Sequence, residues 1–119
     1  MAAMQDLPPE ALEQVAAYFQ ALAEPTRLRI LNALRDGERN VSELAEAAGS
    51  SVANVSRHLS FLTQRGMVER QTRGTSAYYR IADPAVYKLC DTVCGSIARR
   101  HERTVQQAKP FTRSSPRQR

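Results

Sequence analysis

Residues 51–66, with the sequence SVANVSRHLSFLTQRG, constrain the fold of this chain more than any other stretch. Val55, Leu59 and Leu62 recur at i, i+4 and i+7, so a helix would place them on one apolar face that can bury against a core. Ser51 suits the N-cap, and Gly66 suits the position just past the last turn. Taken alone, the stretch fits an ordinary surface helix as well as a helix with a functional face.

The first half of this stretch carries short polar or cationic side chains, on or beside the face opposite the apolar one. They are Ser51, Asn54, Ser56, Arg57 and His58. Such side chains can donate hydrogen bonds to phosphate or reach the edges of bases. The exposed half of the predicted helix is therefore a candidate DNA-reading surface.

The net charge of +5 is distributed unevenly along the chain. Residues 51–80 contain five arginines and one glutamate, whereas residues 1–50 contain four arginines and eight acidic residues. Residues 106–119 add four basic residues and no acidic one. A basic segment beside acidic ones is typical of a protein that turns one side toward a polyanion.

Size and composition exclude several classes of protein. A chain of 119 residues predicts one small domain, and no apolar run approaches the ~20 residues that span a bilayer, so no membrane partner is expected. The first residues lack the basic and apolar regions of a secretory signal, and two cysteines then indicate a reducing, cytoplasmic setting. We expect no enzyme, because no Ser/His/Asp grouping, glycine-rich phosphate loop or paired acid is evident.

The segment before residue 24 predicts an amphipathic helix that begins near Pro8 and Pro9. Its apolar positions follow helical spacing and are Leu12, Val15, Ala16, Phe19, Leu22 and Ala23. The Glu24-Pro25 step ends this helix, and Pro25 suits the first position of a second helix over residues 25–36. The apolar positions expected to face inward there are Leu28, Leu31 and Leu34.

A short helix over residues 41–48 is predicted just before the central stretch. Asn40 and Glu43 form a variant of the capping box at its start, and Leu44 with Ala47 or Ala48 would pack inward. Two short helices joined by a tight turn at Gly49, the second with an exposed polar half, are typical of a helix-turn-helix.

A β-hairpin is predicted directly after the helix-turn-helix. Residues 67–71 and 76–81 alternate as strands, and residues 72–75 form a turn between them. A helix-turn-helix followed by a hairpin is a winged helix. Arg73 at the tip would contact phosphate or a narrow minor groove, or would remain a solvated turn residue.

A last helix over about residues 84–105 closes the predicted domain. Its apolar stripe consists of Val86, Cys90, Val93, Cys94 and Ile97. The expected organisation is a flexible N-terminus over residues 1–8, a domain over 9–105, and a basic disordered tail over 106–119. That tail either adds non-specific DNA affinity or is only solvated. The fold class is mainly α, with about five helices and a small β-hairpin wing.

Two motifs resemble a known family. Residues 21–31, ALAEPTRLRIL, resemble the second-helix signature of ArsR/SmtB-type bacterial repressors, and residues 54–59, NVSRHL, resemble their recognition helix. The hairpin and the closing helix also match, so the resemblance covers roughly residues 10–105. It implies a winged helix-turn-helix repressor that forms a homodimer through its first and last helices. It also implies binding to double-stranded operator DNA and release by an inducer.

Side-chain chemistry suggests a role for each candidate on the recognition helix. Arg57 is the best candidate to read guanine, and Asn54 would read adenine or hold phosphate. Ser51 and Ser56 would hold backbone phosphate near the helix N-terminus. His58 either faces the groove or packs at the seam between this helix and the body.

The resemblance also directs attention to sites where this family senses metals, metalloids or thiol-reactive species. A Cys-x-Cys thiolate site is absent, because Asn40 and Ser42 occupy the matching positions. Cys90 and His101 have the spacing of a zinc pair shared across the dimer axis, but Lys88 and Thr104 stand where the flanking ligands are expected. A complete zinc site of this type is therefore not expected.

Cys90 and Cys94 lie four residues apart, which places both thiols on one face of the last helix. Soft thiolates suit As(III), other soft metal ions or oxidants. Three alternatives follow: a sensor of metalloid or soft metal, a redox or reactive-sulfur sensor, or two small apolar residues in a packed stripe. In the last case the protein would be a repressor or interaction module with no small inducer. Beyond such an ion, no cofactor is expected.

Overall fold

The computed structural model describes residues 3–103, which form five α-helices and three short strands. The chain divides into two compact units, the first ending at Asp83 and the second beginning at Pro84. The helices of the first unit are α1 (Pro9–Leu22), α2 (Pro25–Ala33), α3 (Val41–Ala48) and α4 (Val52–Gln64). Its strands are β1 (Arg39–Asn40), β2 (Val68–Arg73) and β3 (Ser76–Ile81), and 3-10 turns occupy Met4–Asp6 and Leu34–Asp36.

Local capping explains where the helices of the first unit begin. Proline occupies the start of α1 and of α2, where its missing N–H costs nothing. The side chain of Glu24 caps α2 by accepting a hydrogen bond from the Arg27 backbone N–H at 2.9 Å. Asn40 and Glu43 form the predicted capping box of α3, with both hydrogen bonds at 2.9 Å.

The core of the first unit lies between α2, α3, α4 and the sheet. Its largest fully buried side chains are Ile30, Leu34, Leu44, Val55, Leu59, Leu62 and Val68. The predicted apolar stripe of α4 is confirmed, because Val55, Leu59 and Leu62 are all fully buried. Each such side chain contributes on the order of 1.5–3 kcal/mol through burial. The core therefore holds α4 by one face and leaves its other face to solvent.

The inward face of α2 differs from the prediction at one position. Leu28 is 40% exposed, whereas Ile30 is fully buried together with Leu31 and Leu34. Because α2 packs against both α3 and α4, its buried side is centred on Ile30 and Leu31 and continues into Leu34 of the following 3-10 turn, and Leu28 lies outside it. In α3 the buried residues are Leu44, Ala45 and Ala48, so Ala48 rather than Ala47 faces inward.

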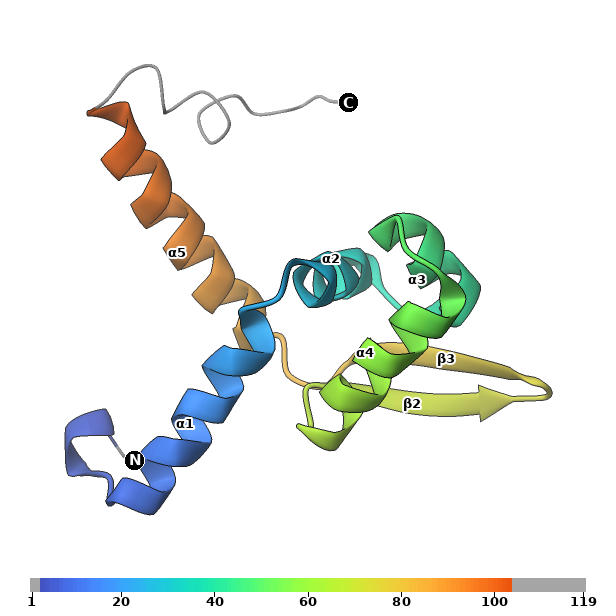
Figure 1. The fold of residues 1–119 in the computed structure, drawn as a ribbon, viewed down its shortest axis with the longest axis horizontal. Coiled ribbons are helices and arrows are strands. Elements are labelled where there is room, and N and C mark those ends of the chain that lie inside the picture. The colour runs from blue at the N-terminus through green and yellow to red at the C-terminus, as the bar shows by residue number, and fades with distance from the viewer. Residues whose placement is uncertain (1–2, 104–119) are drawn as a thin grey trace. The chain divides into compact units, whose positions relative to one another are not determined.

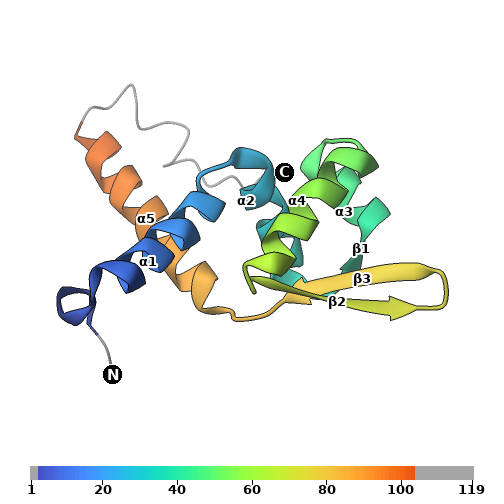
Figure 2. The same cartoon turned by 60° about the horizontal axis from the view of Figure 1, so that its bottom comes forward.

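The sheet contains three antiparallel strands in the order β1-β3-β2, so the hairpin wing has a third strand that the sequence did not predict. β1 pairs Arg39 with Tyr79 and is only two residues long, too short for an alternating pattern to reveal. β2 continues to Arg73, which pairs with Ser76, so the turn is shorter than residues 72–75. Gly74 has φ 62°, a conformation that favours glycine in such a tight turn. Figures 1 and 2 show the β2–β3 tip projecting beyond α3 and α4.

The second unit consists, in its described part, of the single helix α5 (Ala85–Glu102). Val86 is buried, whereas Val93 is 48% exposed and Cys94 is exposed. Cys90 and Ile97 are half-buried, so two of the five residues of the predicted apolar stripe, Val93 and Cys94, are exposed in a single chain. No helix among residues 3–103 is long and apolar enough to cross a membrane. The tail over residues 106–119, predicted to be disordered, lies outside the described residues.

Candidate nucleic-acid interface

The turn between α3 and α4 sets the direction in which α4 leaves the core. Gly49 ends α3 in the left-handed conformation with φ 65°, and the Ser50 backbone N–H returns to the Ala45 carbonyl at 3.1 Å. Ser51 then caps α4, because its hydroxyl oxygen accepts a hydrogen bond from the Asn54 backbone N–H at 3.1 Å. At the other end Gly66 has φ 73°, as expected just after the last turn. The predicted caps of α4 are confirmed.

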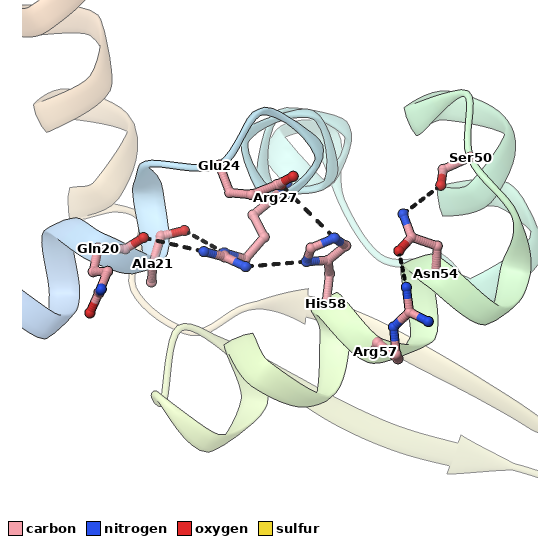
Figure 3. A network of polar contacts seen from close by, with 8 residues as sticks. All are labelled: Gln20, Ala21, Glu24, Arg27, Ser50, Asn54, Arg57 and His58. Atoms are coloured by element: carbon pink, nitrogen blue, oxygen red, sulfur yellow. Dashed lines mark hydrogen bonds and ion pairs between the residues drawn. The ribbon is translucent and has the colours of Figure 1, made fainter.

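The polar half of α4 contains a chain of hydrogen bonds that includes a residue the sequence analysis missed. The Asn54 side-chain N–H₂ donates to the Ser50 hydroxyl at 2.8 Å, and the Arg57 guanidinium donates to the Asn54 carbonyl oxygen. Figure 3 shows this chain running from the turn onto the helix face. The four-residue spacing of Ser50 and Asn54 across the cap was the available signal. Asn54 is half-buried, and its side-chain amide bonds to Ser50 through the nitrogen and to Arg57 through the oxygen. These contacts suit Asn54 to orient Arg57 rather than to read a base by itself.

Arg57 is exposed and has no carboxylate partner among residues 3–103. A guanidinium carries five N–H donors, and the contact with Asn54 uses one of them. The remaining donors can bind the two acceptors of guanine or a phosphate in a bidentate manner. Ser56, one residue before Arg57, is half-buried, so its predicted contact with phosphate stays a prediction.

His58 points away from this face and toward α2. Its Nδ1 lies 3.3 Å from Arg27 Nη1, its Nε2 lies 3.9 Å from Glu24 Oε1, and its side chain is 17% exposed. Because a guanidinium can only donate, Nδ1 is the acceptor and a neutral His58 carries its proton on Nε2. The structure therefore places His58 at the seam between α4 and the body, which was one of the two alternatives.

Arg27 joins three helices at this seam, as Figure 3 shows. Its Nε donates to the Ala21 carbonyl at 2.8 Å and its Nη2 to the Gln20 carbonyl at 3.2 Å, both at the end of α1. Its guanidinium also stacks over the Phe61 ring of α4 at 4.4 Å from the ring centroid. The seam thus fixes α4 relative to α1 as well as α2.

The carboxyl group of Glu24 is part of the same seam, and its pKa is held below the ordinary value. The main cause is the hydrogen bond from the Arg27 backbone N–H, which favours the ionised carboxylate. Burial opposes this effect, and the nearby His58 adds a smaller electrostatic contribution in the lowering direction. The carboxylate form is therefore the one that caps α2.

Arg73 does not lie in the turn, and the description of it as a solvated turn residue is corrected. It is the last residue of β2, and its Nη2 lies 2.7 Å from Glu38 Oε1, while its guanidinium stacks over the Tyr78 ring at 4.9 Å. Its charge is therefore partly neutralised by the body of the protein. Its side chain remains 50% exposed, so a DNA contact from Arg73 stays a prediction.

The five arginines of residues 51–80 fall into two groups. Arg73 pairs with Glu38, and Arg80 pairs with Glu69 at 2.9 Å. The other three have no carboxylate partner within residues 3–103: Arg57, Arg65 and Arg70. The Arg70 side chain, on the wing, donates to the Thr72 hydroxyl at 3.1 Å and has no other hydrogen-bond partner in the described part of the chain. The wing therefore has an uncompensated cation that the sequence analysis did not single out.

The cysteines lie on α5, in the second unit. Cys90 is half-buried, Cys94 is exposed, and the two are not joined in a disulfide. His101 is half-buried, about 16 Å along the helix from Cys90 at 1.5 Å per residue. Within residues 3–103 no three His, Cys, Asp or Glu side chains gather where they could hold a metal ion. A shared ligand set would need a second chain, and Thr104 lies outside the described residues.

A helix-turn-helix with a buried inner face, an exposed polar outer face and an antiparallel wing defines the winged helix-turn-helix class. Comparison with known proteins agrees. Residues 24–70 match the family described as "Bacterial regulatory protein, arsR family". The chain is 43% identical over 82 residues to the HTH-type transcriptional regulator NmtR of Mycobacterium tuberculosis, covering 69% of this chain and 68% of NmtR. This chain belongs to the ArsR family of bacterial regulatory proteins, and the resemblance inferred from its two motifs is confirmed.

Two further similarities bear on function. The chain is 42% identical over 77 residues to a probable mercury resistance operon repressor of Streptomyces lividans, covering 65% of this chain and 62% of that repressor. A solved homodimeric winged helix-turn-helix DNA-binding domain, Mb0332 from Mycobacterium bovis, aligns with TM-score 0.68 and 40% identity over 85% of this chain and 93% of that one. The chain spans only 39% to 68% of the length of three curated relatives that it matches.

Proposed function

We propose that this protein is a homodimeric, DNA-binding transcriptional repressor that reads a two-fold symmetric operator through α4 and is released by an inducer. The observation that carries the proposal is the exposed face of α4, where Asn54 accepts a hydrogen bond from Arg57, an exposed residue with no carboxylate partner among residues 3–103. The opposite face is anchored by the fully buried Val55, Leu59 and Leu62. A rigidly held helix with an exposed guanidinium in its first half has the form of a recognition helix. We propose no catalytic activity.

The distribution of charge supports a polyanionic partner. Arg57, Arg65 and Arg70 have no carboxylate partner within the described part of the chain, although acidic residues are common elsewhere in it. Uncompensated cations on α4 and on the wing would neutralise phosphates on binding and release counterions. This provides affinity for DNA without regard to sequence, while Arg57 provides the base contact.

Exposed apolar side chains on α1 and on α5 support a homodimer. Leu12 and Phe19 of α1 are 40% and 48% exposed, and Val93 of α5 is 48% exposed. Helices that leave large apolar side chains in solvent gain stability by burying them against a second copy. The related Mb0332 domain is homodimeric. A two-fold dimer would place its α4 helices about one DNA turn, ~34 Å, apart.

Cys90 and Cys94 are the groups that we propose for the inducer. They lie four residues apart on α5, and Cys94 is exposed, so a soft ion or an oxidant can reach a thiol. A relative is a probable repressor of a mercury resistance operon, which supports a thiol-binding metal or metalloid as the first candidate. A redox or reactive-sulfur signal is the alternative at the same residues.

The experiment that tests this proposal begins without knowledge of the operator. The full chain is used to select duplexes from a random 30-base-pair library, and affinity for the selected duplex is measured by fluorescence anisotropy at several salt concentrations. We expect an enriched pair of inverted half-sites and an affinity that falls by about 10³-fold or more between 50 mM and 200 mM salt. No enriched site, or an affinity that barely changes with salt, would overturn the proposal.

Arg57→Ala separates base reading from phosphate binding in the same assay. We expect it to cost about 1–3 kcal/mol on the selected duplex and less on a scrambled duplex. The matched control is Arg29→Ala, which removes another exposed arginine, from α2. Equal losses on both duplexes would make Arg57 a phosphate contact.

A further inference from the structure

The side chain of Arg73 turns away from the tip of the wing, although Arg73 is the last residue of β2. We propose that Glu38 forms an autoinhibitory contact with Arg73: it holds the guanidinium against the body of the free protein, and this contact opens before Arg73 can bind DNA. The inference rests on the proposed DNA-binding function and adds a contact within the protein that limits its affinity.

The strand register gives the direction in which Arg73 points. Arg73 pairs with Ser76 beside the turn, whereas Gln71 pairs with Tyr78 two residues nearer the body. The Arg73 Nη2 donates to Gln71 Oε1 at 3.3 Å, and the guanidinium lies 4.9 Å from the centroid of the Tyr78 ring. Two residues of strand rise correspond to about 7 Å. The guanidinium has therefore turned back along the hairpin by up to that length.

Glu38 adds a third contact from outside the hairpin. It lies just before β1, and its Oε1 is 2.7 Å from Arg73 Nη2. The pairing of β1 with β3 holds the neighbouring backbone beside the hairpin. The Glu38 side chain is 24% exposed, so the ion pair is partly shielded from water. We call Glu38, Gln71 and Tyr78, which together hold the Arg73 guanidinium, the latch.

The other wing arginine discussed above, Arg70, points in the opposite direction. Its Nη1 donates to the hydroxyl of Thr72, which is two residues nearer the tip. Side chains alternate along a strand, so Arg70 and Arg73 also lie on opposite faces of the hairpin. The backward direction of Arg73 is thus not common to the arginines of β2 and follows from its own contacts with the latch.

The latch is weak enough for DNA to open it. An ion pair between partly exposed side chains and a cation–π contact each change an equilibrium constant by a factor of up to about five. The hydrogen bond to Gln71 is long, at 3.3 Å. A phosphate forms strong charge-assisted hydrogen bonds with a guanidinium, and a narrow minor groove attracts one electrostatically. Either partner can replace the contacts of the latch.

Opening the latch lowers the affinity for the operator. The free energy that Arg73 gains on DNA is reduced by the free energy needed to leave the latch. At the operator, base contacts from α4 would fix the register, and the tip that projects beyond α3 and α4 in Figures 1 and 2 would meet the duplex at a defined place. We therefore expect Arg73 to leave the latch on the selected duplex and to remain in it on a scrambled duplex.

A double-mutant cycle tests the contact. Affinity for the selected duplex is measured by anisotropy for the wild type, Glu38→Gln, Arg73→Ala and the double variant. Glutamine keeps the shape of glutamate and removes its charge, so a gain common to both backgrounds is a general effect of charge. We expect Glu38→Gln to raise affinity by about two- to five-fold more when Arg73 is present than when it is alanine.

Glu69→Gln is the matched control, because it removes the same charge from the Glu69–Arg80 ion pair of the same sheet. Glu69 and Arg80 face each other directly across β2 and β3, and within residues 3–103 neither bonds to the Arg73 side chain. The effect of Glu69→Gln on affinity should therefore be the same with and without Arg73.

Tyr78→Leu tests the latch from its other side. It removes the ring contact and leaves the charge of the protein unchanged. We expect it to raise affinity for the selected duplex only when Arg73 is present, so the test does not depend on the folding of Glu38→Gln alone. Circular dichroism and thermal unfolding identify any variant that is not folded.

Side-chain NMR follows the latch itself. The Arg73 guanidinium stacks over the Tyr78 ring, so the Arg73 side-chain protons of the free protein should be shielded and resonate upfield of those of Arg70. Adding the selected duplex should remove this shift, and adding the scrambled duplex should leave it in place. A contact that only stabilised the fold would show no such difference between the two duplexes.

The outcomes separate this inference from the proposed function. The inference is overturned, while the repressor proposal stands, if Glu38→Gln acts equally with and without Arg73, if it lowers affinity, or if the upfield shift persists on the selected duplex. If the library yields no site at all, both are overturned. A gain in affinity that requires Arg73, together with a shift that disappears only on the selected duplex, supports the inference.

Discussion

Arg27 and His58 lie 31 residues apart in sequence, yet Arg27 Nη1 and His58 Nδ1 are 3.3 Å apart in the folded chain. This contact joins the start of α2 to the middle of α4. Arg27 also donates to the two carbonyl groups of Gln20 and Ala21 at the end of α1. One side chain therefore ties the proposed recognition helix to a helix that we propose to lie at the dimer interface.

Arg27→Met is predicted to destabilise the protein by about 1.5–3 kcal/mol, because several partly buried hydrogen bonds of a charged group are lost together. Urea denaturation followed by circular dichroism measures this loss. The control is Arg29→Met on the exposed side of the same helix, which should stay within about 0.5 kcal/mol of wild type. Equal effects of the two substitutions would show that the seam contributes nothing specific.

Glu24→Gln is predicted to change the pH dependence of stability. The lowered pKa of Glu24 means that the folded chain prefers the carboxylate, mainly because the Arg27 backbone N–H donates to it. This stabilisation is present above the ordinary value of 4.5 and is lost as the pH falls through and below it. The wild type should therefore exceed Glu24→Gln in thermal midpoint at pH 7, and the gap should shrink by pH 3.

Glu24→Asp is the control for that measurement, because aspartate is also an ionisable N-cap. It should retain the loss of stability in acid that Glu24→Gln lacks. A gap between wild type and Glu24→Gln that stays constant from pH 7 to pH 3 would contradict the assignment.

Asn54→Ala is predicted to weaken binding to the selected duplex by acting through Arg57. Its side chain links Ser50 to Arg57, so its removal leaves the guanidinium free to adopt other orientations. A double-mutant cycle with Arg57→Ala should give a coupling energy of about 1 kcal/mol. Ser56→Ala, on the same helix, should show almost no coupling with Arg57. Strict additivity of Asn54→Ala and Arg57→Ala would exclude the positioning role.

Arg70 is predicted to contribute more than Arg73 to binding by the wing. Arg73 is paired with Glu38, whereas Arg70 donates a hydrogen bond to the Thr72 hydroxyl and has no carboxylate partner among residues 3–103. Arg70→Ala should reduce the slope of log affinity against log salt by about 1, and Arg73→Ala should reduce it by less. Glu38→Gln should raise affinity at low salt by releasing Arg73. A larger loss for Arg73→Ala would restore Arg73 as the main wing contact.

The double variant Cys90→Ser/Cys94→Ser is predicted to bind the selected duplex as the wild type does but to resist release by the inducer. Arsenite, mercuric ion, zinc, cadmium, peroxide and persulfide are compared in one anisotropy assay. If only arsenite and mercuric ion release the wild type, the inducer is a metalloid or soft metal that binds the thiols. Release by peroxide or persulfide would favour redox sensing, and continued release of the double variant would rule out both thiols.

The sequence by itself determined the features that depend on neighbouring residues. The capping box of Asn40 and Glu43, the N-cap at Ser51 and the buried stripe of Val55, Leu59 and Leu62 all involve spacings of a few residues. These groups contact each other within one or two helical turns, so a periodic pattern reveals them. The helix-turn-helix and its family followed from the same local patterns.

Tertiary structure alone decided the features that depend on a partner far along the chain. β1 exists because Arg39 pairs with Tyr79 of β3. The Arg73 side chain forms an ion pair with Glu38, which lies 35 residues earlier in the chain. The exposure of Leu28 follows from the direction in which α2 packs. His58 lies on α4 next to Arg57, which is also polar, so the sequence alone does not separate their roles. In the folded chain the contact with Arg27 places His58 at the seam. The physical reason is that polar side chains take partners by proximity in space, and helical spacing alone does not specify which elements meet.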